Sequence, residues 1–399
     1  MPKISSYPAV YFQLMLVGFS LIMGMGLSAS FLPLLSLELD PTGVLVGFVT
    51  SAWFVARIFV EMPSGFLSDR IGRRRLLVLG LAVSVVGTFT CATSRSIHQL
   101  IFGRALWGLG AALFFTNNIA LVLDMFEPRV RGTALGTFQS LEFIGSFIGA
   151  PLGAVIAANF GYYVTFYIAT LMTSLSFLIA FLSKGLKQVA GKPSEDHVAV
   201  PVRKALHSMR NWGLIVVCTG VMSRMLIEQG IKSTVFQLYL NQILSYDITT
   251  IGIIITARTA TFSIATLLSG RLIDRLGSKP VLIMGLLLEG SCIYVYTVVN
   301  TLVGLISIAL VEGFGSATIS VTLIILLSEV VDAKVRGTAV GFYRTFMDFG
   351  GILGPVLFMF AYESIGVRTP FMIGGALLLA NIALVITMRE QHASDTARG

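Results

Sequence analysis

The stretch Gly65-Phe-Leu-Ser-Asp69-Arg70-Ile-Gly72-Arg73-Arg74-Arg75 recurs in altered form as Gly270-Arg-Leu-Ile-Asp274-Arg275-Leu-Gly277-Ser-Lys279-Pro280. The two copies are 205 residues apart in a chain of 399 residues. The same separation relates Gly108 and Gly110 to Gly313 and Gly315, and Arg131-Gly-Thr-Ala134 to Arg336-Gly-Thr-Ala339. A repeat this long indicates two fused half-proteins rather than a solenoid of short units.

The composition is that of an integral membrane protein. The chain is 55% hydrophobic and 12% charged, whereas soluble domains carry roughly 25% charged residues. A helix needs about 20 apolar residues to cross a bilayer, because lipid satisfies no backbone polar group. Runs of that length predict twelve spans, six in each half, near 8–35, 43–68, 75–93, 98–124, 132–157, 160–183, 212–240, 248–272, 280–298, 302–326, 337–361 and 367–388.

The distribution of basic residues predicts the orientation of these spans. Most of them, including Lys3, the arginines at 70 and 73–75 and the basic residues of the 184–211 loop, fall on one side. The other side has Arg95, Arg368 and at most Lys232. By the positive-inside rule, both termini and the middle loop are expected to be cytoplasmic, in the inner (plasma) membrane. The net charge of +8 then reflects topology and anionic lipid, not nucleic acid.

The expected domains are a first six-helix bundle at 1–183, a cytoplasmic linker at 184–211 and a second bundle at 212–399 with a short tail. The linker segment from Pro201 to Trp212 is either a basic amphipathic helix at the membrane surface or a solvated tether. The three cysteines lie inside separate predicted helices, which supports neither a disulfide framework nor a metal site. No cofactor is expected.

The repeated loop resembles the signature G-x-x-x-D-R-x-G-R-R of the major facilitator superfamily. The matching residues are Gly65, Asp69, Arg70, Gly72, Arg73 and Arg74, and the second copy keeps Gly270, Asp274, Arg275 and Gly277. The resemblance covers essentially the full chain and is closest to the 12-helix drug:proton antiporter group. It implies an all-α fold of two pseudo-symmetric six-helix bundles. It also implies that Asp69 contacts the start of the eleventh helix near Arg336 and gates the cytoplasmic side, although the arginines at 73–75 have a purely topogenic alternative.

A glycine pattern marks the fifth and eleventh helices. Its members are Gly136, Gly145, Gly149 and Pro151 in the first half, and Gly341, Gly350, Gly354 and Pro355 in the second. The pattern resembles the family's antiporter motif G-x8-G-x3-G-P-x-x-G-G, with Ala150 inserted before the proline in the fifth helix. Small residues at helical spacing also permit close packing in any helix bundle. The pattern is therefore consistent with antiport or with packing alone.

Five arginines, at 57, 104, 224, 258 and 344, are expected inside the membrane with six acids, Glu61, Glu142, Glu228, Glu289, Glu312 and Asp348. A lone charge at that depth is costly, so most of these residues are expected to be paired. The i,i+4 spacing permits three local pairs, Arg57 with Glu61, Arg224 with Glu228 and Arg344 with Asp348.

Glu312 is the leading candidate for proton coupling. Ile308 and Ser316 occupy the positions four residues away, so Glu312 has no basic partner on its own helix. An acid without a partner between apolar walls retains its proton readily. Gating, binding of a cationic substrate and a structural role are the alternatives. The other coupling candidates are Arg104, Asp348, Glu142 and Glu61.

The repeat also relates Glu312 to Arg104, which lies in a segment that resembles the family's second motif. Glu312 maps onto Trp107, one turn from Arg104. Arg104 and Glu312 are therefore expected at similar depth on opposite sides of a central cavity. A structural ion pair is the alternative role for Arg104.

The resemblance places helices 1, 4, 7 and 10 around that cavity and Glu289 on a peripheral helix. Candidates for the cavity wall are Asn118, Arg224, Glu228, Phe114, Phe115, Phe236, Tyr239, Phe314, Tyr343 and Arg344. Aromatic rings beside a few charges suit a small amphipathic ligand.

These features favour a secondary active transporter that works by alternating access, most specifically a proton-coupled exporter of a small amphipathic or drug-like molecule. An organic anion, metabolite or lipid-like substrate is the alternative, because intramembrane arginines repel a basic drug. A non-transporting receptor is a remote alternative that predicts an extra domain. No nucleotide-binding motif, catalytic triad or metal cluster indicates an enzyme. The expected partners are the substrate, protons and the bilayer, and the chain is expected to be a monomer.

Overall fold

The computed structural model describes residues 9–43, 45–126, 131–189, 211–331 and 336–388, and this part of the chain is helical without a strand. The first half contains α1 (Ala9–Leu27), α2 (Leu32–Leu39), α3 (Val46–Ile71), α4 (Arg73–Ala92), α5 (Ile97–Met125), α6 (Arg131–Phe160), α7 (Tyr162–Leu182) and α8 (Lys184–Val189). The second half contains α10 (Trp212–Ile227), η2 (Glu228–Val235), α11 (Phe236–Leu238), η3 (Tyr239–Ile243), α12 (Ile248–Leu276), α13 (Ser278–Val295), α14 (Leu302–Val330), α15 (Arg336–Ser364) and α16 (Thr369–Ile386).

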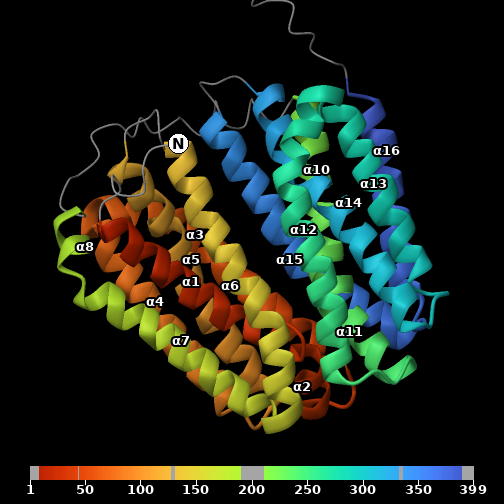
Figure 1. Cartoon of the computed structure of the whole chain (residues 1–399), viewed down its shortest axis with the longest axis horizontal. Helices are drawn as coiled ribbons and strands as arrows, with labels where there is room; N and C mark the ends of the chain where they lie inside the picture. Colours follow the sequence, from red (N-terminus) through yellow and green to blue (C-terminus); the bar gives the residue numbers. More distant parts are fainter. Residues whose placement is uncertain (1–8, 44, 127–130, 190–210, 332–335, 389–399) are drawn as a thin grey trace, which may run out of the picture.

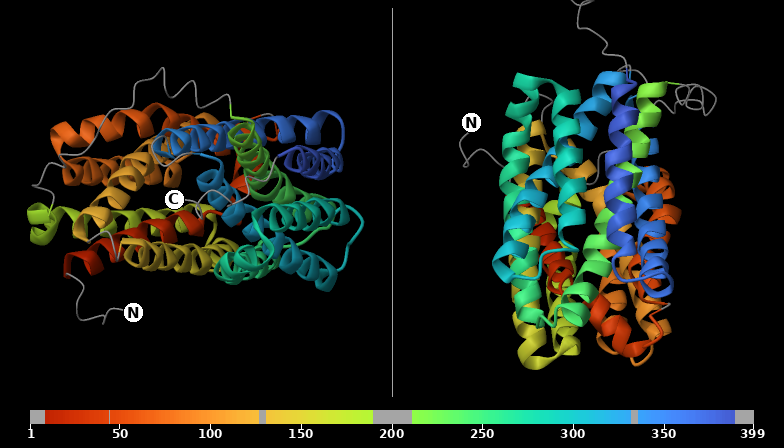
Figure 2. Two further views of the ribbon diagram at one scale, coloured as in Figure 1. Left: turned by 90° about the horizontal axis from the view of Figure 1, so that it is seen from above. Right: turned by 90° about the vertical axis from the view of Figure 1, so that its right-hand side faces the viewer.

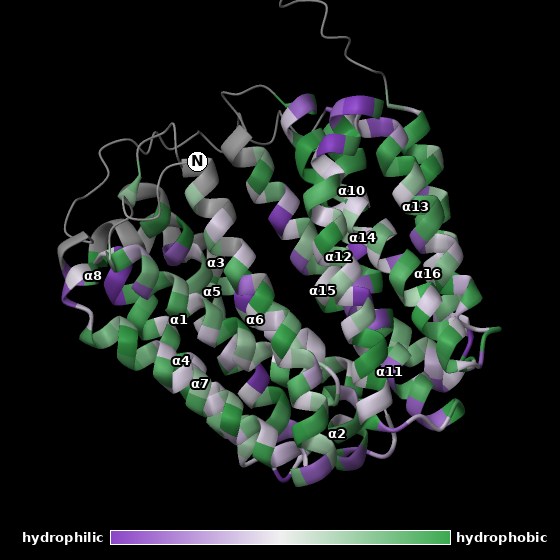
Figure 3. Cartoon of the chain, viewed as in Figure 1, coloured by the Kyte–Doolittle hydropathy of each residue, from purple (hydrophilic) through white to green (hydrophobic). Residues whose placement is uncertain are grey.

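The predicted all-α membrane fold is confirmed. Within the described ranges, 11 helices are long and apolar enough to cross a bilayer. The remaining predicted span is α3, a helix of 26 residues that contains the apolar stretch Val46–Val60. Hydrophobic residues cover the helices over most of their length, and hydrophilic residues gather at the helix ends and at scattered points inside (Figure 3).

The first predicted span, 8–35, is wrong as a single helix. The chain leaves α1 at Leu27, turns through Ser28–Phe31 and starts the separate helix α2, with a proline in its first turn. Proline has no N–H to donate and is favoured in the first turn of a helix, so Pro33 favours a new helix over continuation of α1. The seventh span is continuous from Trp212 to Ile243, but it widens into π-helix at η2 and η3.

The two halves form separate groups of helices that lie side by side (Figures 1 and 2). Residues from α3 pack against α15, and residues from α6 pack against α12. The ribbons converge at the end of the molecule that carries α2 and α11, and they diverge toward the end where the chain begins (Figure 1). At the converged end, Ser51 Oγ donates to the Ile352 carbonyl at 2.6 Å and Gln237 Nε2 donates to the Ala29 carbonyl at 2.6 Å.

Equivalent glycines give the halves the same internal packing. A side chain at Gly149 of α6 would lie 2.6 Å from the Met23 carbonyl oxygen of α1. At Gly354 of α15, 205 residues later, a side chain would overlap the carbonyl oxygen of Leu226 on α10. Both helix pairs therefore pack backbone to backbone at these points, as small residues in membrane helices permit.

The signature glycines Gly72 and Gly277 each precede a helix, α4 and α13. Their φ angles are +97° and +85°, in the region that residues with a Cβ rarely adopt. Both positions therefore require glycine to turn the chain between antiparallel helices. The side chains of Asp69 and Arg70, and the expected contact of Asp69 near Arg336, lie outside the described residues, as do those of Glu61 and residues 201–210 of the linker.

One basic residue of each signature motif caps the last membrane-spanning helix of its half. Arg74 Nη2 donates to the Phe181 carbonyl at 2.6 Å and to the Ala180 carbonyl at 3.3 Å, at the end of α7. Lys279, its equivalent in the second half, donates through Nζ to the Ile386 and Met388 carbonyls at 3.1 and 3.0 Å, at the end of α16. The last carbonyls of a helix lack backbone partners, and a cation at that end also interacts favourably with the helix dipole.

Replacing Arg74 or Lys279 with alanine is therefore expected to destabilise the protein by about 0.5–1 kcal/mol each, because the last carbonyls of α7 or α16 lose their donor. Thermal unfolding in detergent measures the effect. Arg75→Ala is the matched control, because Arg75 is an exposed neighbour in the same loop. Equal loss of stability in Arg75→Ala would show that the loop needs positive charge in general and not these caps.

Candidate functional site

A cavity of about 110 Å³ lies between the two halves. The first half contributes Ala29, Ser146 and Ala150. The second half contributes most of the wall, namely Lys232, Ser233, Phe236, Gln237, Ile254, Ile255, Arg258, Thr259, Tyr296, Ala309 and Glu312. The cavity is therefore a place where both halves and several charges meet.

Lys232 is the centre of a buried group of charges beside this cavity. Its Nζ lies 2.6 Å from Glu228 Oε2, 2.7 Å from Glu289 Oε1 and 2.8 Å from Glu312 Oε1. It also donates to Ser316 Oγ at 3.2 Å. The side chain of Lys232 is 4% exposed, and those of Glu289 and Glu312 are 0% exposed. One ammonium group thus holds three carboxylates from η2, α13 and α14.

Arg258 of α12 adds a second cation. Its Nη2 donates to Glu228 Oε1 at 2.9 Å, and its Nη1 lies 3.9 Å from Glu312 Oε1. We call Glu228, Lys232, Arg258, Glu289 and Glu312 the charge cluster. With every member ionised, the charge cluster carries one more negative than positive charge. Charged groups at membrane depth are costly unless paired, and they mark functional sites by default.

Two glycines of α14 bring the helices of the charge cluster together. A side chain at Gly313 would overlap the carbonyl oxygen of Arg258 on α12, and one at Gly315 would lie 3.0 Å from the Glu289 amide nitrogen on α13. Glycine at these positions therefore lets α12 and α13 approach α14 closely, which brings Arg258 and Glu289 to Glu312.

The π-helix η2 supplies the other two members. Glu228 and Lys232 are one turn apart, and both side chains point into the charge cluster. The wider hydrogen-bonding pattern is also seen at Thr234, whose Oγ1 donates to the Gln229 carbonyl at 2.9 Å, five residues back. Short π-helical segments inside α-helices occur frequently at functional sites.

The charge cluster exists in one half only. The positions 205 residues before its members carry Met23, Leu27, Trp53, Ser84 and Trp107, none of which is charged. The contacts of Gly108 and Gly110 nevertheless match those of Gly313 and Gly315, with Trp53 and Ser84 as neighbours. The two halves therefore share a scaffold, and the charge cluster is confined to the second half.

Three members of the charge cluster were missed or ranked low by sequence reasoning. Lys232 was considered only as a basic residue on the side of the membrane that carries few charges. This expectation was wrong, because the side chain of Lys232 is buried inside the protein. Glu289 was expected on a peripheral helix, yet it contacts Lys232. Arg258 was recognised as intramembrane without a role. The detectable signal was Lys232 itself, four residues after Glu228 inside a predicted span.

Glu228 has an i,i+4 partner, but this partner is Lys232 and not the expected Arg224, and the expected pair of Arg57 with Glu61 lies outside the described side chains. Glu228 pairs with Lys232 and Arg258, whereas Arg224 Nη1 contacts the sulfur of Met225 at 3.7 Å. Arg57 Nη2 lies 3.6 Å from Asp348 Oδ1, so this pair joins α3 of one half to α15 of the other.

Arg104 and Glu312, which the repeat was expected to set on opposite sides of one cavity, occupy different surroundings. The guanidinium of Arg104 lies over the Trp107 ring, 5.2 Å from its centroid. Glu312 lines the cavity between the halves, and Arg104 is not among the residues that line it. Arg344 is half-buried on α15.

Of the aromatic residues expected in the cavity wall, Phe236 lines the cavity, beside Tyr296, which was not foreseen. Phe114 is fully buried against Phe115, with ring centroids 5.4 Å apart, and Tyr239 packs on Phe371 at 5.2 Å. Phe314 is half-buried and Tyr343 is buried. Asn118 is fully buried and donates to Glu142 Oε1 at 3.2 Å, so it belongs to the interior of the first half.

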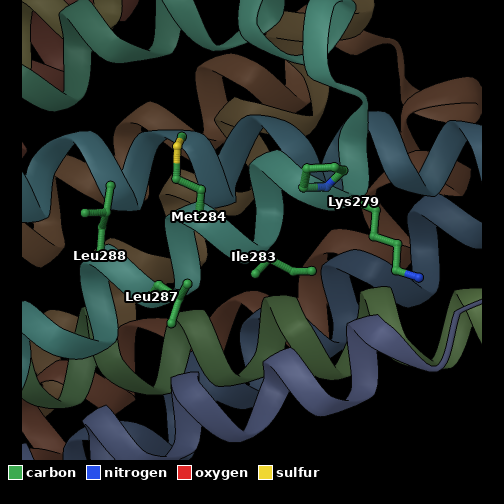
Figure 4. A pocket seen from close by; sticks show the side chains of 6 residues that line it. Lys279, Ile283, Met284, Leu287 and Leu288 are labelled. Carbon is green, nitrogen blue, oxygen red and sulfur yellow. The ribbon is translucent and has the colours of Figure 1, made fainter.

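A larger hollow of about 560 Å³ runs along α13 (Figure 4). Its lining residues are Lys279, Pro280, Ile283, Met284, Leu287 and Leu288, all from one helix. The hollow is almost entirely apolar and lies within one half. It therefore lacks the charges and the two-sided wall of the cavity beside Lys232.

Comparison with known proteins places this arrangement in a family. The profile of the Major Facilitator Superfamily matches residues 14–231 and 217–399. The chain is 22% identical to multidrug resistance protein 2 of Bacillus subtilis (strain 168) over 388 residues, which is 95% of each chain. It is also 22% identical to multidrug resistance protein 1 of the same organism, over 93% of this chain and 94% of that protein.

Solved structures agree on the fold. The structure of a mutant of the nucleoside transporter NupG superposes with a TM-score of 0.75 at 14% identity, covering 94% of this chain and 99% of NupG. The human organic anion transporter MFSD10 superposes with a TM-score of 0.63 at 17% identity, covering 95% and 100% of the two chains. With its two bundles, its apolar helices and this match over nearly the whole length, the chain belongs to the Major Facilitator Superfamily of membrane transporters.

Proposed function

We propose that the protein is a proton-coupled exporter of small amphipathic molecules and that the charge cluster couples proton movement to substrate movement. The observation that carries this proposal is a buried group of three carboxylates that contact Lys232 beside the cavity between the halves. The names of the Bacillus relatives, which describe multidrug resistance, favour export of drug-like compounds.

The closeness of the three carboxylates has a direct chemical consequence. Like charges repel strongly in a desolvated site, so the binding of one proton relieves the repulsion within the charge cluster. Glu312 is the proposed site of this proton, because it is the carboxyl group of the charge cluster that lines the cavity. Protonation of Glu312 weakens its bond to Lys232 and so loosens α14 from η2, which contacts the first half through Thr234 and Thr50, whose hydroxyl oxygens lie 3.3 Å apart.

The protein is proposed to be a monomer in the plasma membrane. The start of the chain and the linker are proposed to lie on the cytoplasmic side. The domains are proposed at 1–183 and 212–399, joined by 184–211. With the halves in contact at the end that carries α2 and α11, the divergent end is proposed to be open to the cytoplasm. Alternating access then consists of rocking the two bundles about the cavity.

Replacing Glu312 with glutamine tests the coupling. Purified protein is reconstituted in proteoliposomes that contain a pH-sensitive dye, and proton flux is followed on addition of the lipophilic cation ethidium. We expect the proton flux coupled to ethidium to be lost, because glutamine can neither bind nor release the proton.

The control is Glu363→Gln, which changes an exposed acid at the end of α15 away from the charge cluster. We expect this variant to retain the flux of the native protein. Unchanged proton exchange in Glu312→Gln would refute the assignment of coupling to Glu312.

An organic anion is the second candidate substrate, because both cations of the charge cluster, Lys232 and Arg258, line the cavity. The same proteoliposomes are therefore tested with fluorescein. Proton flux driven by fluorescein and not by ethidium assigns the transporter to anions.

A further inference from the structure

The first half contains a second buried carboxyl site, at Glu142 of α6. Asn118 of α5 donates through Nδ2 to Glu142 Oε1 at 3.2 Å. Asn118 is 0% exposed, and its Oδ1 is buried without a hydrogen-bond partner. Glu142 is half-buried. The carboxyl lies against Gly18 of α1, where a Cβ would be only 2.8 Å from Oε1.

The described side chains around Glu142 provide no cation for it. Of the groups on the helices packed against α6, Tyr11 donates to the Ala134 carbonyl at 2.7 Å, Arg104 lies over Trp107, and Arg258 binds Glu228. The other titratable groups described on these helices lie in the first or last two turns, away from Glu142. They are His98, Tyr162, Tyr163, Tyr167, Arg271, Asp274 and Arg275. Glu142 thus has a neutral amide as its partner.

A neutral carboxylic acid satisfies this site and a carboxylate does not. An ionised Glu142 leaves an unpaired charge in a largely apolar environment and leaves Asn118 Oδ1 without a donor. A protonated Glu142 supplies the missing donor, because its Oε2–H can bond to Oδ1 while Nδ2–H bonds to Oε1. The pair then forms a closed ring of two hydrogen bonds.

We propose that Asn118 holds Glu142 as a neutral acid and that Glu142 is a second proton-carrying site, separate from the charge cluster. Ser146 and Ala150, one and two turns further along α6, line the cavity between the halves. Glu142 therefore lies on the same face of α6, toward the divergent end of the molecule. Its partial exposure gives the proton a route to the space between the halves, where it is released to water as Glu142 becomes a carboxylate.

The carrier role rests on the proposed function, but the protonated state does not. In the second half, the equivalent positions carry Leu323 and Met347. The duplicated scaffold therefore accepts an apolar pair at these two places. This makes Asn118→Leu with Glu142→Met a matched double variant that removes the acid and the amide while keeping a packing that the protein already uses.

Infrared spectroscopy of the full-length protein in detergent tests the protonated state without a substrate. At neutral pH we expect a carbonyl band of a protonated carboxyl group that is absent in Glu142→Gln and in the double variant, persists in Glu312→Gln, and shifts in Asn118→Leu. A spectrum that Glu142→Gln leaves unchanged overturns the proposal, because Glu142 is then ionised in the native protein.

Proteoliposome assays with ethidium and fluorescein test the carrier role. We expect Glu142→Gln to lower the number of protons moved per dye molecule and to flatten the pH dependence of the rate, with dye movement retained. An unaltered ratio and pH profile overturn the carrier role. Suppose that the infrared band is assigned to Glu142 while the native protein moves no protons with either dye. In that case the proposed function and the carrier role both fail, but the protonated pair of Glu142 and Asn118 stands.

Discussion

Replacing Lys232 with methionine is expected to destabilise the protein by about 3–5 kcal/mol at neutral pH and to abolish coupled transport. The substitution leaves Glu228, Glu289 and Glu312 with Arg258 as the remaining described cation of the charge cluster. Three carboxylates then repel one another in a desolvated site, and Glu289, which is fully buried, loses its partner. Few single substitutions in this chain remove so many short contacts.

Thermal unfolding in detergent at several pH values measures the effect of Lys232→Met. Acid protonates the carboxyl groups and removes their repulsion, so the loss of stability is expected to be largest at high pH and to shrink as the pH falls. The double variant Lys232→Met with Glu289→Gln has the same formal charge as the native charge cluster and should recover much of the stability. A Lys232→Met protein as stable as the native one at pH 8 would contradict the buried placement of Lys232.

The second large effect is expected at Gly354, where alanine should destabilise the protein by about 1–3 kcal/mol and slow transport. A methyl group there overlaps the Leu226 carbonyl oxygen, and a backbone atom cannot move aside as a side chain can. Helix α15 must then separate from α10, which continues into η2 and the charge cluster.

Gly341→Ala is the matched control on the same helix and in the same sequence pattern. An added Cβ at Gly341 meets no described atom within 4 Å. Alanine is a better helix former than glycine by roughly 0.5–1 kcal/mol, so Gly341→Ala should be neutral or stabilising. Unfolding measurements on both variants are therefore expected to show shifts of opposite sign. Equal shifts would mean that glycine acts in this pattern through helix propensity alone.

Much of the fold was predictable, because each spanning segment is determined by local composition. A run of about 20 apolar residues has one stable outcome in a bilayer, whatever the rest of the chain does. The break after Leu27 was missed because the residues between Leu27 and Pro33 carry no charge that would interrupt an apolar run. A π-helix likewise leaves hydropathy unchanged, so η2 had no signal in composition.

The site was only partly predictable. Glu228 and Glu312 were identified as intramembrane acids, with Arg224 as the expected i,i+4 partner of Glu228 and no partner on its own helix for Glu312. In the structure Glu228 contacts Lys232 of η2 and Arg258 of α12, and Glu312 of α14 contacts the same two cations. Arg57 and Asp348, both assigned local partners, meet across the interface of the halves. Spacing along one helix reveals which side chains share a face and not which neighbouring helix that face contacts.

The sequence by itself determined the duplication, the membrane class and the positions where the halves differ, because these depend on composition and on comparison of the chain with itself. Only the tertiary structure decided that the charges of the second half converge on Lys232 and that Asn118 meets Glu142. The physical reason is that a buried charge must be neutralised by whatever group the packing brings near. At this site that packing is set by glycines such as Gly313 and Gly315, through backbone contacts between helices far apart in the chain.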